Sequence, residues 1–176
     1  MAIKKIKVLY GGESSEREVS LESGKYIFQA VKDLGYEAQL IDYPKNFSSH
    51  QLTEEDFIFI ALHGQDGESG ALQKLLQQKC IPFSGSHYQA CVNTWNKNTC
   101  KVLLKNNKIP TPNWITISSL HEMEKDLGTP FFNQLRPFKE LFLKPVEDGS
   151  SIDVFKITCN KDLENAISGC ADPRRT

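Results

Sequence analysis

The sequence predicts an α/β protein whose amino-terminal part contains a parallel sheet, and three observations support this prediction. Residues 5–10 alternate as a short strand that ends at Gly11-Gly12, and a helix with apolar residues at helical spacing follows. Residues 37–42 predict a second strand, and residues 56–62 are a largely apolar run, typical of a strand buried on both faces. Strand, helix, strand, loop and strand in this order favour a parallel sheet.

The first helix has signals at both ends. Ser15 followed by Glu18 predicts a capping box at its start, and Gly35 predicts a left-handed cap at its end. The residues predicted to form its buried face are Val19, Ser23, Tyr26, Ile27, Ala30, Val31 and Leu34.

The chain beyond the third strand predicts more helices and then a second domain. The predicted helices are 71–79 (capped by Glu68 or Ser69), 87–107 with a break near Asn96, 118–128, and 160–168 capped by Asn160. The predicted strands are 114–117, 140–145 and 154–158. Ile109-Pro-Thr-Pro reads as a stiff connector near the entry to a second domain. We expect two domains, with residues 1–93 in the first and 94–176 in the second.

Composition excludes several classes of protein. The 176 residues carry a net charge of −1, which gives no reason to expect a nucleic-acid partner. The amino terminus lacks the pattern of a signal peptide, and no apolar run approaches the ~20 residues that span a bilayer. The five cysteines include no Cys-x-x-Cys spacing, so reduced thiols in a cytoplasmic protein are expected.

Candidate binding residues follow the first and third predicted strands. Glu16 falls in the first turn of a helix at the carboxyl edge of the sheet, where ligands bind in open α/β folds. Its carboxylate suits a ligand ammonium group, and the free amides of the turn suit an anion. Two readings remain open for each residue: Glu16 binds a ligand or only complements the helix dipole, and His63 is a ligand contact or a structural histidine.

Two motifs then resemble one family. Residues 11–21 (GGESSEREVSL) resemble the amino-terminal signature of D-alanine–D-alanine ligases, which belong to the ATP-grasp superfamily, and residues 63–70 (HGQDGESG) resemble their histidine-glycine loop. The resemblance implies that Glu16 orients the amino group of the first D-alanine and that His63 lies near its carboxylate. It also assigns Ser15 and Val19 to the substrate-binding set.

A phosphate-binding loop is predicted near the second pair of strands. Lys144 ends a strand before Gly149-Ser150-Ser151, a pattern suited to holding phosphate oxygens through amides, hydroxyls and an ammonium group. The alternative is a plain hairpin turn. The segment resembles the ATP-grasp phosphate loop, which implies that Lys144 and Ser151 bind ATP.

The same resemblance implies two further roles. Ser150 matches a serine in a hydrogen-bonded Glu-Ser-Tyr set, so Glu16 and Ser150 are expected to be catalytic. Lys97 matches a lysine that contacts nucleotide phosphates, although any single lysine is more often a solvated surface residue.

Two residues depart from the family pattern. Asn96 stands where the family usually has an aspartate, and its effect is left open. Asp153 stands in place of the usual glycine, and its carboxylate is expected to repel ATP phosphates and restrict the loop backbone.

The resemblance implies a Rossmann-like, pre-ATP-grasp domain followed by the first part of an ATP-grasp α+β domain. It also implies ATP-dependent joining of two D-alanines for peptidoglycan synthesis, with ATP and Mg²⁺ as cofactors and a homodimer formed through the first domain. The match covers about half of such a ligase, so we expect a truncated chain that is inactive alone. The metal ligands of the family fall in the other half, so no metal site is expected here.

Two alternatives stay open. The chain is a non-catalytic remnant of a decayed ligase gene, or it belongs to another ATP-grasp ligase or nucleotide-binding module.

Overall fold

The computed structural model describes residues 5–53, 55–117 and 140–171. The chain divides into two compact units, Met1–Trp95 and Asn96–Thr176. The helix expected at 118–128 lies outside the described residues.

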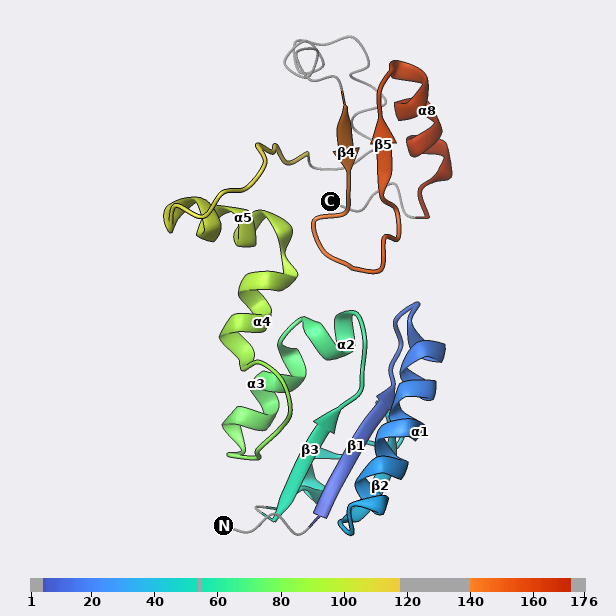
Figure 1. The fold of residues 1–176 in the computed structure, drawn as a ribbon, viewed down its shortest axis with the longest axis vertical. Helices are drawn as coiled ribbons and strands as arrows, with labels where there is room; N and C mark the ends of the chain where they lie inside the picture. The colour runs from blue at the N-terminus through green and yellow to red at the C-terminus, as the bar shows by residue number, and fades with distance from the viewer. Residues whose placement is uncertain (1–4, 54, 118–139, 172–176) are drawn as a thin grey trace. The chain divides into compact units, whose positions relative to one another are not determined.

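The first unit contains a three-stranded parallel sheet in the order β2-β1-β3 (Figure 1). Its strands are β1 (Lys5–Gly11), β2 (Glu37–Tyr43) and β3 (Asp56–Ile60). The helices of this unit are α1 (Arg17–Asp33), η1 (Ser49–Gln51), α2 (Gln65–Glu68), α3 (Ala71–Gln78) and α4 (Tyr88–Trp95). A parallel bridge between Ile58 and Phe83 extends the edge at β3. All three predicted strands of the sheet are therefore present.

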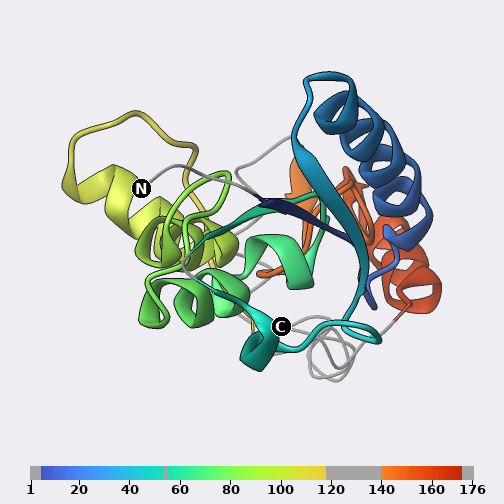
Figure 2. The same ribbon diagram turned by 90° about the horizontal axis from the view of Figure 1, so that it is seen from below.

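The main core lies on the face of the sheet opposite α1, and Figure 2 shows α1 and α3 on opposite sides of the strands. Successive residues of a strand point to opposite faces, so Leu9 of β1 faces α3 while Tyr10 faces α1. The buried members of this cluster are Leu9, Ile41, Ile58, Leu62, Leu72, Leu76 and Ile81. From α3, Leu72 and Leu76 are buried in this cluster, and Leu75 is half-buried.

The buried face of α1 differs from the prediction. Its buried residues are Ser20, Gly24 and Val31, whereas Val19, Tyr26 and Leu34 are 57%, 71% and 75% exposed. The reason is close packing, since a Cβ atom on Gly24 would clash with the Cβ of Tyr10 in the strand below. Small residues thus let the helix backbone approach the sheet, and Val31 is the one residue of the predicted face that is buried.

Several predicted helix caps are also wrong. The Ser15–Glu18 capping box is absent, because α1 begins after Glu16 with no side-chain cap. Helix α3 begins after Gly70, which has a φ of 95°, and neither Glu68 nor Ser69 caps it. The expected cap of α1 at Gly35 is confirmed by its φ of 84° and by a bond from the Tyr36 N–H to the Val31 carbonyl.

The second unit contains α5 (Lys97–Asn106), the antiparallel pair β4 (Leu141–Leu143) and β5 (Phe155–Ile157), and α8 (Asn160–Gly169). The predicted break at Asn96 is confirmed, since its side chain caps α5 by accepting the Thr99 N–H. Helix α8 begins at Asn160 as expected, but its cap is Cys159 rather than Asn160, and the Asp162 carboxylate accepts the N–H groups of Thr158 and Cys159.

The predicted strand at 114–117 is not formed. Residues 109–117 have no regular secondary structure. The Trp114 indole N–H instead donates to Asn98 Oδ1 at 2.8 Å, and Lys101 Nζ lies 5.2 Å from the centre of the Trp114 ring. Packing against α5 therefore takes the place of strand pairing among these described residues.

The first unit contains a buried ion pair. Lys7 Nζ donates to Asp56 Oδ2 at 2.8 Å, and the two side chains are only 8% and 3% exposed. Lys7 also donates to the Gln51 carbonyl, and the Thr53 N–H donates to Asp56. Burial raises the pKa of Asp56, but the hydrogen bonds from Lys7 and Thr53 outweigh it and leave this pKa below its usual value. The pair connects β1, β3 and the loop that precedes β3.

Candidate functional site

The segments that follow β1 and β3 meet at the carboxyl edge of the sheet. Ser14 Oγ donates to the His63 carbonyl at 3.0 Å. A Cβ atom on Gly64 would lie 3.1 Å from Glu16 Oε2, so the Glu16 carboxylate lies directly against the glycine that follows His63. His63 Nε2 is 3.3 Å from Ser23 Oγ of α1. The structure thus brings together Glu16 and His63, which are 47 positions apart in the sequence.

The glycine turn after β1 is held by contacts within the chain. Gly11 and Gly12 have φ values of 87° and 86°, a conformation that favours glycine. The Gly12 N–H donates to the Tyr43 carbonyl, and the Glu13 N–H donates to Asp66 Oδ2 at 2.6 Å. These two amides therefore already have acceptors within the chain.

Arg17 and Asp42 brace this turn, and the sequence reasoning missed them. Both terminal nitrogens of Arg17 donate to the Asp42 carboxylate, at 2.8 and 2.7 Å, and Arg17 also donates to the Gly12 carbonyl at 3.0 Å. The hydrogen bonds from Arg17 lower the pKa of Asp42. Two-pronged pairing of this kind fixes geometry as well as charge.

The lowered pKa values of Asp42 and Asp56 predict acid sensitivity. Their stabilising contribution is complete above the unfolded-state pKa of about 3.9 and is lost as the pH falls through the lower, folded-state values. We expect the urea midpoint of the chain to fall steadily below about pH 4.

Asp42→Asn should lower the midpoint at neutral pH and flatten its decline in acid. Glu22→Gln, at an exposed position of α1, makes the same charge change away from the turn and should leave the decline unchanged. An Asp42→Asn profile parallel to that of the unmodified chain would contradict the assignment.

The other predicted substrate residues lie near this edge. Ser15 is exposed just before α1, and Val19 is exposed on its first turn. Glu68 does not cap the next helix but accepts the Gly64 N–H at 3.0 Å, which closes the loop after His63. The sequence signal for this role of Glu68 was its position in the glycine-rich segment 63–70, where a side-chain acceptor can bind a loop amide.

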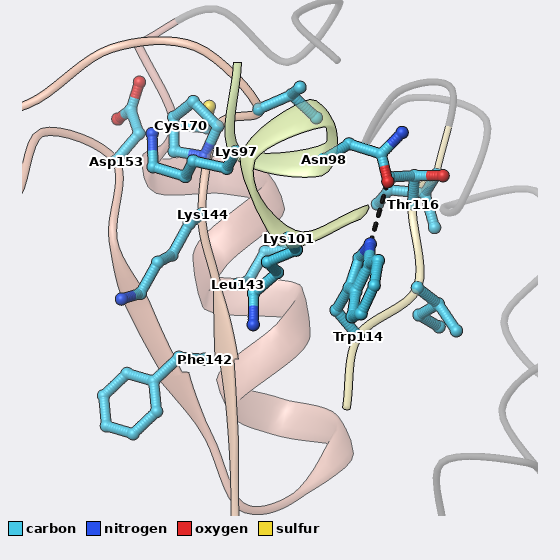
Figure 3. Close-up of a pocket in the computed structure, with 14 residues that line it drawn as sticks. Lys97, Asn98, Lys101, Trp114, Thr116, Phe142, Leu143, Lys144, Asp153 and Cys170 are labelled. Carbon is cyan, nitrogen blue, oxygen red and sulfur yellow. Dashed lines mark hydrogen bonds between the residues drawn. The ribbon is translucent and has the colours of Figure 1, made fainter. Parts of the chain in front are cut away.

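The second unit contains a pocket of about 160 Å³ (Figure 3). Three lysines line it, Lys97, Lys101 and Lys144, together with Trp114 and Asp153. Two of these lysines, Lys97 and Lys144, were predicted from the sequence to bind nucleotide, whereas Lys101 was not. Lys144 Nζ lies 5.7 Å from the centre of the Phe142 ring. Cationic groups beside apolar walls suit a ligand that carries phosphate or carboxylate.

Lys97 holds the loop that precedes β5. Its N–H donates to the Val146 carbonyl at 2.8 Å, and its ammonium group donates to the Asp148 carbonyl at 2.7 Å. Ser150 and Ser151 are exposed in this loop and are not among the residues that line the pocket.

The conformation of the same loop is unusual for its residues. Four non-glycine residues have positive φ: Asp148 (108°), Ser150 (51°), Ser151 (60°) and Asp153 (51°). Asp153 thus adopts the backbone conformation that suits the glycine expected at that position. Its carboxylate accepts the Ala171 N–H at 3.1 Å.

Within 5–53, 55–117 and 140–171, no group of three or more His, Cys, Asp or Glu side chains is placed to hold a metal ion. None of the described helices is long and apolar enough to cross a membrane.

The fold is similar to part of the fold of solved ligases. A crystal structure of D-alanine–D-alanine ligase from Bacillus anthracis superposes with a TM-score of 0.77 at 28% identity, covering 94% of this chain and 53% of that one. A structure of the same organism's ligase complexed with ATP gives a TM-score of 0.73 at 29% identity, with 94% and 54% covered. These similarities confirm the predicted α/β class.

Sequence comparison leads to the same family. A D-alanine–D-alanine ligase from Magnetococcus marinus is 35% identical over 168 residues, which make up 94% of this chain and 53% of that protein. No protein-family model matches the chain. The chain is homologous to the amino-terminal half of D-alanine–D-alanine ligases and spans about half the length of the curated relatives it matches.

Proposed function

We propose that this chain supplies the amino-terminal half of an ATP-dependent D-alanine–D-alanine ligase, which forms the dipeptide used in peptidoglycan synthesis. The observation that carries the proposal is the contact of the Glu16 carboxylate with Gly64, next to His63, at the carboxyl edge of the sheet. Sequence similarity to ligases over nearly the whole chain supports it.

The first unit would bind the first D-alanine. Glu16 offers a carboxylate to the substrate ammonium group, and the absence of a side chain at Gly64 leaves that carboxylate room. The His63 ring would donate to the substrate carboxylate, with Ser23 Oγ fixing its orientation. Ser15 and Val19 would complete the rim as exposed residues at the start of α1.

The second unit would bind part of the nucleotide. Lys97 and Lys144 would offer positive charge to the phosphates, Ser151 would contact them from the loop, and Ser150 would assist catalysis. The resemblance to the ligases implies that Mg²⁺ would be held by ATP and by carboxylates outside the matched half. When bound, the ion would neutralise phosphate charge.

The proposal includes a cytoplasmic homodimer that associates through the first unit. Helix α1 exposes Val19, Tyr26 and Leu34, which gives that unit apolar surface to bury against a second copy.

One observation favours a second candidate, a non-catalytic remnant of a ligase. Asp153 lines the same pocket as Lys97 and Lys144, and its negative charge would repel a bound phosphate. Another ATP-grasp ligase or nucleotide-binding module remains a third candidate, which the position of Glu16 and His63 makes less suitable.

The substrate role of Glu16 is tested by titrating isotope-labelled protein with D-alanine while amide signals are recorded by NMR. We expect shifts at Gly12 and Gly64, and Glu16→Gln should weaken binding about tenfold or more because it removes the charge that faces the ammonium group. Glu18→Gln, an exposed residue two positions along the chain, is the matched control and should bind as the unmodified chain does. Equal losses in both variants would reject a specific role for Glu16.

A further inference from the structure

Residues 96 and 97 hold the base of the loop after β4 through three hydrogen bonds. Asn96 Nδ2 donates to Glu147 Oε1 at 3.1 Å. The Lys97 N–H donates to the Val146 carbonyl at 2.8 Å, and Lys97 Nζ donates to the Asp148 carbonyl at 2.7 Å. Three consecutive loop residues are thus held by two consecutive residues at the start of α5.

The orientation of the Asn96 amide follows from its second role. Asn96 Oδ1 accepts the Thr99 N–H at 3.0 Å, which caps α5. An amide oxygen must face this donor, so the NH₂ group must face the other way, toward Glu147. The helix cap therefore sets the direction of the bond to the loop.

The loop depends on such external contacts for its shape. Non-glycine residues rarely adopt positive φ, yet Asp148, Ser150 and Ser151 all do so. Local preference alone would favour other conformations, so contacts made from outside the loop must select this one.

We propose that Asn96 is a positioning residue for the 146–153 loop, matched specifically to the glutamate at 147. An aspartate at 96 would keep the cap, since aspartate and asparagine cap helices about equally well. It would also replace the donor that faces Glu147 with a second carboxylate, and the two like charges would repel. The presence of Asn96 in this chain is therefore explained by Glu147, which needs a hydrogen-bond donor. An aspartate at 96 would need a basic residue at 147.

The inference rests on the proposed nucleotide-binding role of this loop, so the experiment measures loop order and binding separately. Loop order is followed by amide hydrogen exchange at Ile152, whose N–H donates to the Gly149 carbonyl at 3.1 Å. Binding is followed by titration with Mg-ATP. The proteins compared are the unmodified chain, Asn96→Asp, Glu147→Lys, the double variant and Asn106→Asp.

Asn96→Asp should speed exchange at Ile152 by about three- to tenfold at low salt, and the effect should shrink in about 1 M salt because the repulsion is screened. The double variant, with an attractive pair at the same positions, should return exchange to within about twofold of the unmodified chain. Asn106→Asp makes the same charge change at the far end of α5 and should have no effect. Thermal midpoints of Asn96→Asp should stay unchanged, because the cap is kept.

The outcomes separate the two proposals. Unchanged exchange in Asn96→Asp, or no recovery in the double variant, would overturn the positioning role. Faster exchange with recovery supports that role, and a parallel loss and recovery of Mg-ATP affinity supports it for nucleotide binding. If exchange responds but no variant binds Mg-ATP at any concentration, the positioning of the loop holds and the proposed nucleotide function fails.

Discussion

The 176-residue polypeptide, purified alone, is expected not to form D-alanyl-D-alanine at a measurable rate and to bind Mg-ATP with a Kd in the millimolar range or weaker, about −4 kcal/mol or less favourable. Phosphoryl transfer requires metal ions that bridge the phosphates and a closed site that excludes water. The pocket of the second unit is lined by three lysines, and Asp153, which also lines it, adds a negative charge that disfavours phosphate.

Calorimetric titration with Mg-ATP and a phosphate-release assay in the presence of D-alanine test the two parts. Lys144→Met should abolish the residual nucleotide binding, whereas Lys156→Met serves as a control, since Lys156 pairs with Glu140 on the exposed surface. Micromolar affinity for Mg-ATP, or turnover that depends on D-alanine, would show that this half carries more of the function than we propose.

Removing one member of the buried pair Lys7–Asp56 should destabilise the first unit by about 3–5 kcal/mol, because the remaining charge would stay buried without its partner. Asp56→Asn and Lys7→Met are the single variants. Exchanging both members for apolar residues of similar volume should recover most of the loss, because no uncompensated charge remains. The free energy of unfolding in urea is the measurement.

The exposed pair Lys5–Glu37 is a matched control in the same sheet, where it joins β1 to β2 with a distance of 2.9 Å between Lys5 Nζ and Glu37 Oε1. Glu37→Gln should shift the urea midpoint little, since solvent screens this pair. Equal effects at Asp56 and Glu37 would mean that burial does not set the strength of the Lys7–Asp56 pair.

Strands and the edge that gathers Glu16 and His63 were predictable because they depend on local pattern. Alternation and apolar runs marked β1 and β3, and parallel strands place their carboxyl ends at one edge. Glycines in the segments after β1 and β3 indicated the turns. The resemblance to ligases then added roles for residues that the spacing had already placed together.

The packing of α1 was not predictable from apolar spacing. The hydrophobic pattern selects large side chains, but the sheet accepts Ser20 and Gly24 because the helix backbone comes close to Tyr10. A glycine within a helical pattern was the available signal, since it often marks close approach.

Contacts between residues distant in the sequence were beyond the reach of local patterns. Arg17 and Asp42 are 25 positions apart, and Lys97 and the Asp148 carbonyl are 51 apart. Such pairs depend on the finished fold, and nothing near each residue announces its partner. The caps predicted at the starts of α1 and α3 also failed, since these helices begin after Glu16 and Gly70 with no side-chain cap.

The small residues of α1 that face the sheet, Ser20 and Gly24, set the distance between this helix and the strands, and this distance sets the position of Glu16 at the carboxyl edge. Ser20 bonds both the Gly11 N–H and the Ala61 carbonyl, so the helix rests on the ends of two strands with almost nothing between. Glu16 immediately precedes the first turn of α1 and therefore moves with this helix. A bulkier residue at 20 or 24 would push α1 away from the sheet and displace the Glu16 carboxylate with it. Since a displacement of about 1 Å can cost about a hundredfold in rate, side chains that never meet a ligand would tune its alignment.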